Sequence, residues 1–209
     1  MKPSSTIAKA RAMARRAGWP AKRIRTELDA KAVLEGGCYY DQRAADHIVE
    51  FFAQFLRHSL GEWAGQPFVL QPWQRDRFIE PLFGWKRADG TRRYRRGGVW
   101  IPKKNGKSCL CSAICLYLLV GDQEPGPQVF SAANDRNQAA LIYRECAAMV
   151  RQSPDLLGVL EPIDSRKAIH VRSQNGYYQA LSADVPTKEG LNISGLVIDE
   201  VHAMKDRAL

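Results

Sequence analysis

The second half of this chain alternates short apolar strands with helices, and this alternation constrains the fold more than any other feature of the sequence. The predicted strands are Val99–Ile101, Gln128–Ala132, Ala168–Val171, Tyr177–Leu181 and Gly195–Ile198, and the predicted helices are Gly106–Leu119 and Asp135–Arg151. Alternation of this kind is typical of a parallel sheet. The run Gly195–Ile198 is continuously apolar, which predicts a strand buried on both faces. We therefore expect an α/β fold with a mostly parallel sheet.

The segment IPKKNGKS lies between the first predicted strand and the following helix. Backbone N–H groups of such a turn point toward an anion, and its lysine reaches the β- and γ-phosphates of a nucleotide. Lys107 is expected in that role, and Ser108 as a Mg²⁺ ligand. Ile101 stands where the usual pattern has its first glycine, and a GKS triplet also occurs in ordinary turns. The flanking strand and helix favour a phosphate loop. Its ATP-binding residues would be Pro102, Lys103, Lys104, Asn105, Gly106, Lys107 and Ser108.

Two carboxylates follow the last predicted strand in the segment LVIDEVH. Ligands of open α/β sheets bind at the carboxyl ends of the strands. In an enzyme with a phosphate loop, the first carboxylate holds Mg²⁺ through its water shell, and an adjacent Glu can polarise the attacking water. We assign these roles to Asp199 and Glu200. The alternative is a strand that ends in a solvated acidic turn, and His202 either couples hydrolysis to movement or is a plain surface residue.

Charge and composition narrow the class of protein. The chain has 209 residues, and 31 Lys and Arg against 22 Asp and Glu give a net charge of +9, which favours an anionic partner such as nucleic acid, nucleotide or a membrane surface. Its longest apolar stretch, 109–120, is shorter than the roughly 20 residues of a membrane span. The five cysteines include no CxxC pair and are expected to be reduced core thiols. A soluble protein that does not bind a membrane is predicted.

The first hundred residues read differently from the rest. Residues 1–34 are basic and Ala-rich, interrupted at Gly18, and are expected to form a helical N-terminal arm. Amphipathic spacing predicts a helix over Asp41–Leu60, and Pro72 opens another through Ile79. A basic loop or hairpin is expected over 84–98. Its arginines are candidates for DNA phosphate contact, although a solvated basic face is the simpler interpretation: Arg92, Arg93, Arg95 and Arg96.

These motifs together resemble the large terminase subunits of tailed bacteriophages, in the branch with an RKNGKS-type loop and a DELH-type acidic motif. The similarity extends to the segments VFSAANDRNQAALIYRECAAMV and LSADVPTKEGLNISGLVIDEVHAM, and to the upstream stretch that contains LQPWQRDRFIE. The resemblance implies a P-loop NTPase fold of the additional-strand, catalytic-Glu type, with ATP and Mg²⁺ as cofactors. It also implies that a Gln beside the Pro-Trp pair contacts adenine, which falls on Gln74, with Gln71 as the weaker candidate.

Two departures from the family pattern affect these expectations. Many terminases have an Arg early in the phosphate loop that stabilises the transferring phosphoryl group, whereas this chain has Lys103 and Lys104. The role either persists in Lys103 as a catalytic cation, moves to Arg95 or Arg96, or is absent. The family also continues past the acidic motif into a nuclease domain. We expect an arm over 1–34 and an ATPase domain over 35–209 that is incomplete after the acidic motif, with no nuclease activity.

The resemblance implies an ATP-hydrolysing motor that packages viral double-stranded DNA into the procapsid. Its partners would be that DNA, the portal protein and the small terminase subunit, in a ring of identical copies in the bacterial host cytoplasm. Two alternatives remain: a helicase-like translocase, because DEVH resembles a DExH box, and a non-catalytic prophage remnant.

In the same family, a strand that follows the acidic motif inserts between the phosphate-loop strand and the acidic-motif strand. The sequence does not contain that strand. We therefore expect Val99–Ile101 and Leu196–Ile198 to lack a shared neighbour, and Lys107 and Asp199 to be poorly placed around Mg²⁺. The 209-residue chain by itself should then bind ATP weakly, hydrolyse little or none, and aggregate through its open sheet.

Overall fold

Capping residues define the helices at the N-terminus. The computed structural model describes residues 4–102, 105–133, 136–182 and 192–201. Helix α1 (Ser5–Arg16) begins where the side chain of Ser4 accepts a hydrogen bond from Ile7 N, and it ends before Gly18. Helix α2 (Glu27–Leu34) begins with a reciprocal capping box between Thr26 and Asp29. Capping of this kind satisfies N–H groups that have no partner within a helix.

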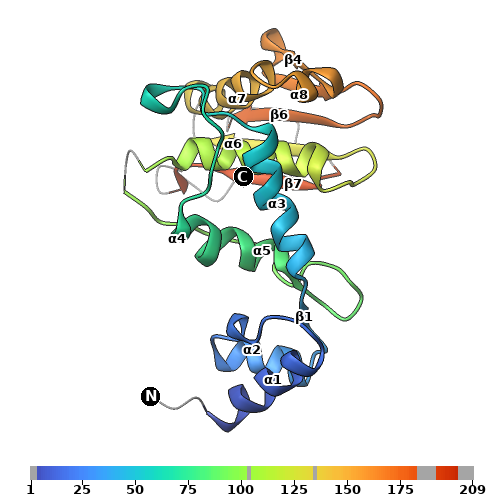
Figure 1. Cartoon of the computed structure of the whole chain (residues 1–209). Coiled ribbons are helices and arrows are strands. Elements are labelled where there is room, and N and C mark those ends of the chain that lie inside the picture. Colours follow the sequence, from blue (N-terminus) through green and yellow to red (C-terminus); the bar gives the residue numbers. More distant parts are fainter. Residues whose placement is uncertain (1–3, 103–104, 134–135, 183–191, 202–209) are drawn as a thin grey trace. The chain divides into compact units, whose positions relative to one another are not determined.

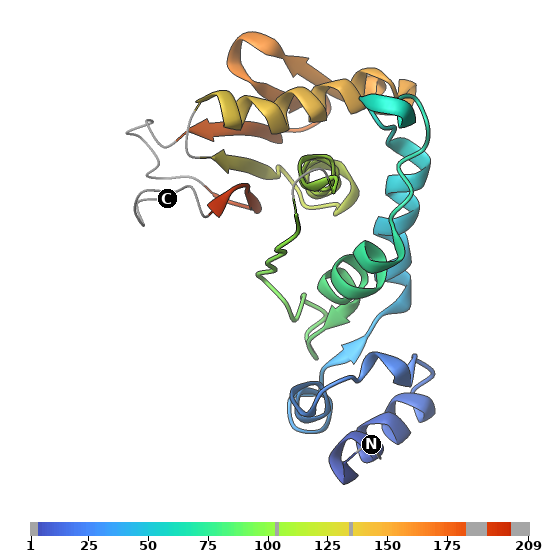
Figure 2. The same ribbon diagram turned by 90° about the vertical axis from the view of Figure 1, so that its left-hand side faces the viewer.

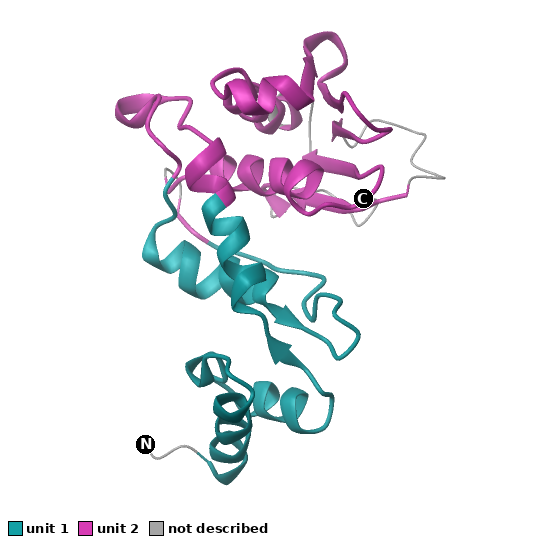
Figure 3. Cartoon of the chain, turned by 45° about the vertical axis from the view of Figure 1, so that its right-hand side comes forward, with its two compact units in different colours: residues 1–50, 69–100 teal, residues 51–68, 101–209 magenta. Residues whose placement is uncertain are grey.

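The chain divides into two compact units, which Figure 3 shows in different colours. Unit 1 comprises 1–50 and 69–100, and unit 2 comprises 51–68 and 101–209. Residues 1–34 therefore belong to the same unit as the segment that precedes the phosphate loop. The predicted arm is helical as expected, but it shares a hydrophobic core with later residues. That core consists of Ala10, Ala14, Ile24, Ala30, Val33, Tyr40, Ala45 and Trp85.

Unit 1 also contains a short pair of antiparallel strands from distant parts of the sequence and a helix interrupted by a π-helical turn. Strands β1 (Tyr39–Tyr40) and β2 (Trp85–Lys86) pair antiparallel, and α3 (Gln42–Phe55) follows β1 and ends in unit 2. The predicted helix at Pro72 is observed as three consecutive segments. These are α4 (Pro72–Gln74), a π-helical turn (Arg75–Ile79) and α5 (Glu80–Gly84). The helix predicted over 41–60 ends five residues early, because the chain turns at Leu56 toward a bridge between Arg57 and Pro67.

Two buried or half-buried ion pairs tie the helical arm to the later part of unit 1. Arg23 pairs with Glu80, whose side chain is only 1% exposed, and Arg75 donates to the same carboxylate at 2.8 Å. Arg93 donates to Asp29 Oδ1 at 2.9 Å and also lies over the ring of Trp85. A charge buried without a partner would be strongly destabilising. These pairs therefore make the arm a structural part of unit 1.

Unit 2 is built on a five-stranded sheet in the order β4-β5-β6-β3-β7 (Figures 1 and 2). Its strands are β3 (Gln128–Ala133), β4 (Leu160–Ile163), β5 (Ala168–Val171), β6 (Tyr177–Ser182) and β7 (Gly195–Ile198). β3 pairs parallel with both β6 and β7, whereas β4, β5 and β6 pair antiparallel. The α/β prediction is confirmed, and the parallel part of the sheet is the part that carries the acidic motif.

Helices α6 and α7 pack side by side against β3 in unit 2. α6 (Lys107–Leu116) continues as a π-helical turn (Tyr117–Gly121), and α7 spans Arg136–Arg151. Ser112 Oγ donates to Ile142 O at 3.2 Å across their contact. The inner residues predicted for α7 are all buried: Ala139, Ile142, Cys146, Met149 and Val150. A short helix α8 (Pro154–Val159) and single 3-10 turns at Ala21–Arg23, Gly61–Trp63 and Asp164–Arg166 complete the described secondary structure.

Two strand predictions are wrong, and both errors have the same cause. Val99–Ile101 forms no strand, because no described segment pairs with it, and Trp100 is 90% exposed. β7 exists as predicted, but it is not buried on both faces: Leu196 is 42% exposed and Ile198 is 38% exposed. Among the described residues β7 pairs only with β3, so it is an edge strand. Apolar composition predicted β7 but could not reveal that no described strand pairs with its second edge.

Within the described residues, no helix combines the length and the apolar character that a membrane-spanning helix needs.

Candidate nucleotide-binding site

The phosphate-loop segment turns into helix α6 through a glycine in a left-handed conformation. Gly106 is the N-cap of α6 and has φ of +73°. A Cβ atom added there would meet nothing within 4 Å, so glycine is favoured because of the positive φ angle and not because of a lack of space. A residue with a Cβ costs about 1–2 kcal/mol in this conformation. The position of the glycine in the motif is therefore explained by the turn itself.

The N-terminal end of α6 is open to a ligand. No side chain among the described residues caps it, and the first helical bond runs from Leu110 N to Gly106 O at 3.0 Å. Asn105 Nδ2 donates to Pro102 O at 3.3 Å, and this hydrogen bond joins two residues of the predicted loop. Uncapped N–H groups at a helix start favour an anion such as a phosphate. The predicted loop residues Lys103 and Lys104 lie outside the described part of the chain.

The acidic motif begins at the carboxyl end of β7. Asp199 N donates to Ala132 O at 3.2 Å, which extends the parallel pairing of β7 with β3 by one residue. Parallel strands present their carboxyl ends at one edge of the sheet, where ligands of α/β proteins bind. Asp199 is therefore fixed at this edge by backbone hydrogen bonding, as the sequence predicted.

The two motifs meet although they are far apart in the sequence. Ser108 Oγ lies 3.4 Å from Asp199 Oδ2, and the two residues are separated by 91 positions. A Mg²⁺ ligated by Ser108 would therefore have the Asp199 carboxylate beside it, within reach of its water shell. The placement of Lys107 and Asp199 around Mg²⁺ stays a prediction.

The start of β7 also lies close to the turn that follows α6. A Cβ atom on Gly195 would lie 2.7 Å from Leu118 Cδ1, so a larger residue there would require the Leu118 side chain to shift. Strand glycines often mark a close approach of this kind. Sequence reasoning placed Gly195 in the strand but did not recognise this contact.

Glu200 adopts an unusual backbone conformation directly after Asp199. Its φ is +51°, and its N–H donates to Asp199 Oδ1 at 2.9 Å. Left-handed conformations of residues other than glycine cost about 1–3 kcal/mol and persist where the surroundings hold them. No sequence pattern indicated this conformation. His202, which was considered as a coupling residue, lies outside the described residues.

The thiols around the site remain protonated near neutral pH. Burial, followed by the negative charge of Asp199, raises the pKa of Cys111 to about 12, while Lys107 acts in the opposite direction. Burial and Glu145 likewise raise the pKa of Cys109 to about 12. All five cysteines are free; Cys115 and Cys146 are buried in the core as predicted, whereas Cys38, Cys109 and Cys111 are only partly buried.

Metal binding at this site would need more than protein side chains. The described residues contain no group of three or more His, Cys, Asp and Glu side chains that could hold a metal ion. Mg²⁺ in nucleotide sites commonly takes one or two protein ligands together with phosphate oxygens and water. Ser108 and Asp199 fit that kind of site.

The predicted adenine-contacting residues belong to unit 1, whereas the phosphate loop begins in unit 2. Gln74 is 5% exposed, and its Oε1 accepts a hydrogen bond from Gln71 N at 2.8 Å. Gln71 is exposed and is the N-cap residue of α4, where it forms a capping box with Gln74. The side-chain oxygen of Gln74 thus stabilises the start of α4, and adenine contact by either Gln stays a prediction.

The four arginines of the basic loop divide into two pairs. Arg92 lies over the ring of Phe83, and Arg93 is held by Asp29 and aromatic rings. Arg95 and Arg96 are exposed. Contact with DNA phosphates therefore fits Arg95 and Arg96 better than Arg93, whose charge is already compensated.

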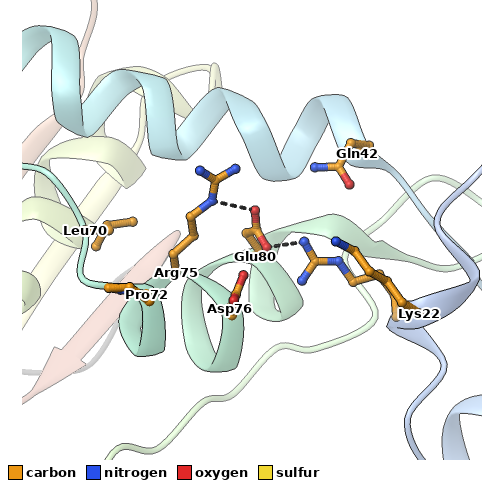
Figure 4. Close-up of a pocket in the computed structure, with 8 residues that line it drawn as sticks. Lys22, Gln42, Leu70, Pro72, Arg75, Asp76 and Glu80 are labelled. Atoms are coloured by element: carbon orange, nitrogen blue, oxygen red, sulfur yellow. Dashed lines mark hydrogen bonds and ion pairs between the residues drawn. The ribbon is translucent and has the colours of Figure 1, made fainter.

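A pocket of about 580 Å³ in unit 1 contains none of the predicted site residues (Figure 4). Its lining residues are Lys22, Arg23, Gln42, Leu70, Pro72, Arg75, Asp76 and Glu80. The Glu80 carboxylate at its centre already binds Arg23 and Arg75. Because these charges compensate one another, we assign no ligand to this pocket.

A loop at a helix start, a serine in that helix and an acid at the end of a neighbouring parallel strand define the class of P-loop nucleoside triphosphatases. Residues 72–209 match the family described as "Terminase large subunit, ATPase domain". The match covers more than half of the chain, and the chain therefore belongs to this family.

A similar protein sequence and a similar solved structure both come from bacteriophage HK97. The chain is 31% identical over 156 residues to the large terminase subunit of Enterobacteria phage HK97, covering 74% of this chain and 30% of that protein. It also resembles the crystal structure of the HK97 bacteriophage large terminase, with a TM-score of 0.60, 29% identity and the same coverage of 74% and 30%. The chain thus spans less than a third of the length of these relatives.

Proposed function

We propose that this chain supplies the ATP-hydrolysing site of a phage terminase large subunit, which drives the packaging of viral double-stranded DNA into the procapsid. Membership of the terminase ATPase-domain family supports the reaction class. The observation that carries the proposal is the 3.4 Å approach of Ser108 Oγ to Asp199 Oδ2. A strand that ended in an ordinary solvated acidic turn would have no reason to meet the phosphate-loop serine.

Each residue of the site has a distinct proposed role. The open N-terminus of α6 binds phosphate oxygens, and Lys107 at its first position neutralises the β- and γ-phosphates. Glu200 accepts a proton from the attacking water and orients it for in-line attack. Lys103 is the proposed cation beside the transferring phosphoryl group, in place of the arginine found in many terminases.

Ser108 and Asp199 would hold the Mg²⁺ that such sites use. The ion supplies neutralisation of the phosphate charge when bound. The protein's contribution is to keep the two oxygens at a fixed spacing, which the parallel pairing of β7 with β3 and the Gly195 contact support. Gln74 and Gln71 are the proposed contacts to adenine.

The proposed partners follow from the family. They are double-stranded viral DNA, the portal protein and the small terminase subunit, with the motor acting as a ring of identical copies in the bacterial host cytoplasm. The net charge of +9 supports an anionic partner. The family match disfavours the helicase-like alternative, because the matching relatives are terminases.

Two substitutions in the assembled packaging motor test the site. Lys107→Ala should reduce ATP hydrolysis by roughly 10²–10³-fold through lost nucleotide binding, because the phosphates lose their main counter-charge. Glu200→Gln should retain nucleotide binding and lose about 10²–10⁴-fold in turnover. Measurements are steady-state phosphate release and nucleotide affinity.

The exposed residues Lys31 and Glu62 provide matched controls, and Lys31→Ala and Glu62→Gln should leave both quantities unchanged. Normal turnover by Glu200→Gln would remove Glu200 from the catalytic role. Absence of ATP hydrolysis by the unsubstituted motor would instead support the non-catalytic remnant.

A further inference from the structure

The two oxygens of the Asp199 carboxylate have different partners. Oδ2 lies 3.4 Å from Ser108 Oγ, on the side of the phosphate loop, whereas Oδ1 accepts the N–H of Glu200 at 2.9 Å. The Asp199 carboxylate therefore contacts both the serine of the phosphate-loop motif and the backbone N–H of Glu200. Hydrogen bonds from an N–H to an ionised carboxylate are among the stronger ones in proteins.

The backbone conformation of Glu200 matters because of the geometry of a strand. Successive side chains of an extended strand point to opposite faces of the sheet, and the exposure of β7 alternates in this way. If β7 continued through Asp199 and Glu200, their carboxylates would point to opposite faces of the sheet. The left-handed turn at Glu200, with φ of +51°, interrupts this alternation.

A left-handed conformation is unfavourable for a residue with a side chain, so something must hold it. The structure supplies one local restraint, the hydrogen bond from Glu200 N to Asp199 Oδ1. Aspartate side chains commonly stabilise turns through such bonds to nearby backbone N–H groups. Glu200 is half-buried and follows β7, which is an edge strand among the described residues, so this hydrogen bond acts where the sheet pairs the chain on one side alone.

We propose that Asp199 is a positioning residue for Glu200 in addition to its role toward Mg²⁺, with one carboxylate oxygen for each task. This inference rests on the proposed function. Asp199 would hold Mg²⁺ or one of its water ligands through Oδ2, on the Ser108 side, while Oδ1 stays with the Glu200 N–H. Asp199 thereby links occupancy of the metal site to the orientation of the catalytic glutamate.

The hydrogen bond is tested by amide exchange in the nucleotide-free packaging motor that contains this chain. Asp199→Asn keeps a carbonyl oxygen that can accept the Glu200 N–H, whereas Asp199→Ala removes it. We expect exchange at Glu200 to accelerate about tenfold in Asp199→Ala and to stay within about twofold of the native rate in Asp199→Asn and Ser108→Ala. Equal exchange in Asp199→Ala and the native protein, or equally fast exchange in Asp199→Asn and Asp199→Ala, overturns the proposal.

The left-handed turn is tested independently by thermal unfolding. Glycine adopts this conformation without strain, so Glu200→Gly should unfold at a higher temperature than Glu200→Ala. This order is the reverse of that expected within a regular strand, where alanine is the more stable residue. A higher unfolding temperature for Glu200→Ala would show that Glu200 is not held in the turn, and would overturn the proposal.

Positioning is separated from metal binding by hydrolysis at increasing Mg²⁺ concentration. If Asp199 acted only on the metal, saturating Mg²⁺ would restore Asp199→Ala and Ser108→Ala to similar kcat values. We expect Asp199→Ala to remain at least tenfold below Ser108→Ala, because Glu200 stays misplaced. Equal kcat values at saturation overturn the positioning role. Failure of the proposed ATPase function would appear as absent hydrolysis in the native motor, while the exchange and unfolding measurements would still report on the hydrogen bond.

Discussion

The two units of this chain use charged side chains in opposite ways. In unit 1, Glu80 is 1% exposed and binds Arg23 and Arg75, and Asp29 binds Arg93. In unit 2, the charged residues of the proposed site are half-buried at the ends of secondary-structure elements, and Asp199 contacts two uncharged groups, the Ser108 hydroxyl and the Glu200 N–H. Paired charges hold segments together, whereas the less compensated charges of unit 2 can still receive a ligand.

A second contrast lies within the sheet itself. β3 is paired on both sides, and Val129, Phe130 and Ala132 are nearly inaccessible. β7 is paired only with β3 among the described strands, and its apolar side chains are partly exposed. Asp199 and Glu200, to which we propose metal-binding and catalytic roles, thus follow an edge strand of the described sheet. An edge strand is locally less stable than a central strand, and functional segments often lie in such regions of low local stability.

The largest expected effect concerns the open edge of β7. A preparation of the 209-residue chain alone should show little or no Mg²⁺-dependent ATP hydrolysis and should aggregate, because exposed strand edges pair with other chains. Phosphate release and light scattering are the measurements. Robust hydrolysis by a monodisperse preparation would show that the edge does not limit the site.

A substitution on the same strand sharpens this prediction. Lysine at an exposed edge position opposes pairing between chains, so Leu196→Lys should reduce aggregation of the chain without restoring hydrolysis. Recovery of hydrolysis together with solubility would mean that aggregation, and not the open edge, suppressed the activity.

The next effect is on the buried ion pairs of unit 1. Glu80→Ala should destabilise the protein by about 3–5 kcal/mol, because it leaves the buried Arg23 without a counter-charge. Replacement of both partners, as Arg23→Met with Glu80→Leu, should recover most of that loss. Denaturant unfolding measures both. A cost below about 1 kcal/mol for Glu80→Ala would show that the pair does not hold the arm.

A smaller, pH-dependent effect is expected at Asp29. Burial raises the pKa of Asp29, but hydrogen bonds from Thr26, Arg93 and the backbone outweigh it, so the pKa lies below its usual value of 3.8. The lowered pKa means that the stabilising contribution is present above about pH 4 and is lost as the pH falls through the folded-state pKa. Asp29→Asn should be about 1–2 kcal/mol less stable near pH 7, and the difference from the native protein should shrink below pH 4. A pH-independent difference would contradict this.

The smallest effect is expected at the exposed arginines of the basic loop. Replacement of Arg95 and Arg96 by Gln should lower the salt-dependence slope of DNA binding by about 2 and leave stability unchanged, because each phosphate contact contributes about 0.9 to the slope. Arg93→Gln should instead reduce stability and leave the slope unaltered. An unchanged slope after replacing Arg95 and Arg96 would mean that these residues do not contact DNA phosphates and belong to a solvated basic surface.

Much of the site was predictable from local sequence. The helix that begins at Gly106, and the apolar strand before Asp199, follow from rules that act over a few residues. The predicted strands at 128–132 and 168–171 and the helix at 135–151 are observed within one or two residues. The apolar periodicity that predicts such segments is set by their own residues.

Features that depend on distant partners were not predictable. Val99–Ile101 has the composition of a strand but pairs with no segment that the structure describes, and the arm residue Arg23 pairs with Glu80, 57 positions later in the chain. The left-handed turn at Glu200 likewise has no sequence signature, since glutamate seldom adopts it.

The sequence by itself determined the chemical groups of this protein, the order of its helices and strands, and the family to which it belongs. Only the tertiary structure decided that Asp199 reaches Ser108, that its second oxygen holds Glu200, and that β7 is an edge strand. The physical reason is that composition and periodicity are local, whereas a contact between distant residues depends on which surfaces are left for each segment to pack against.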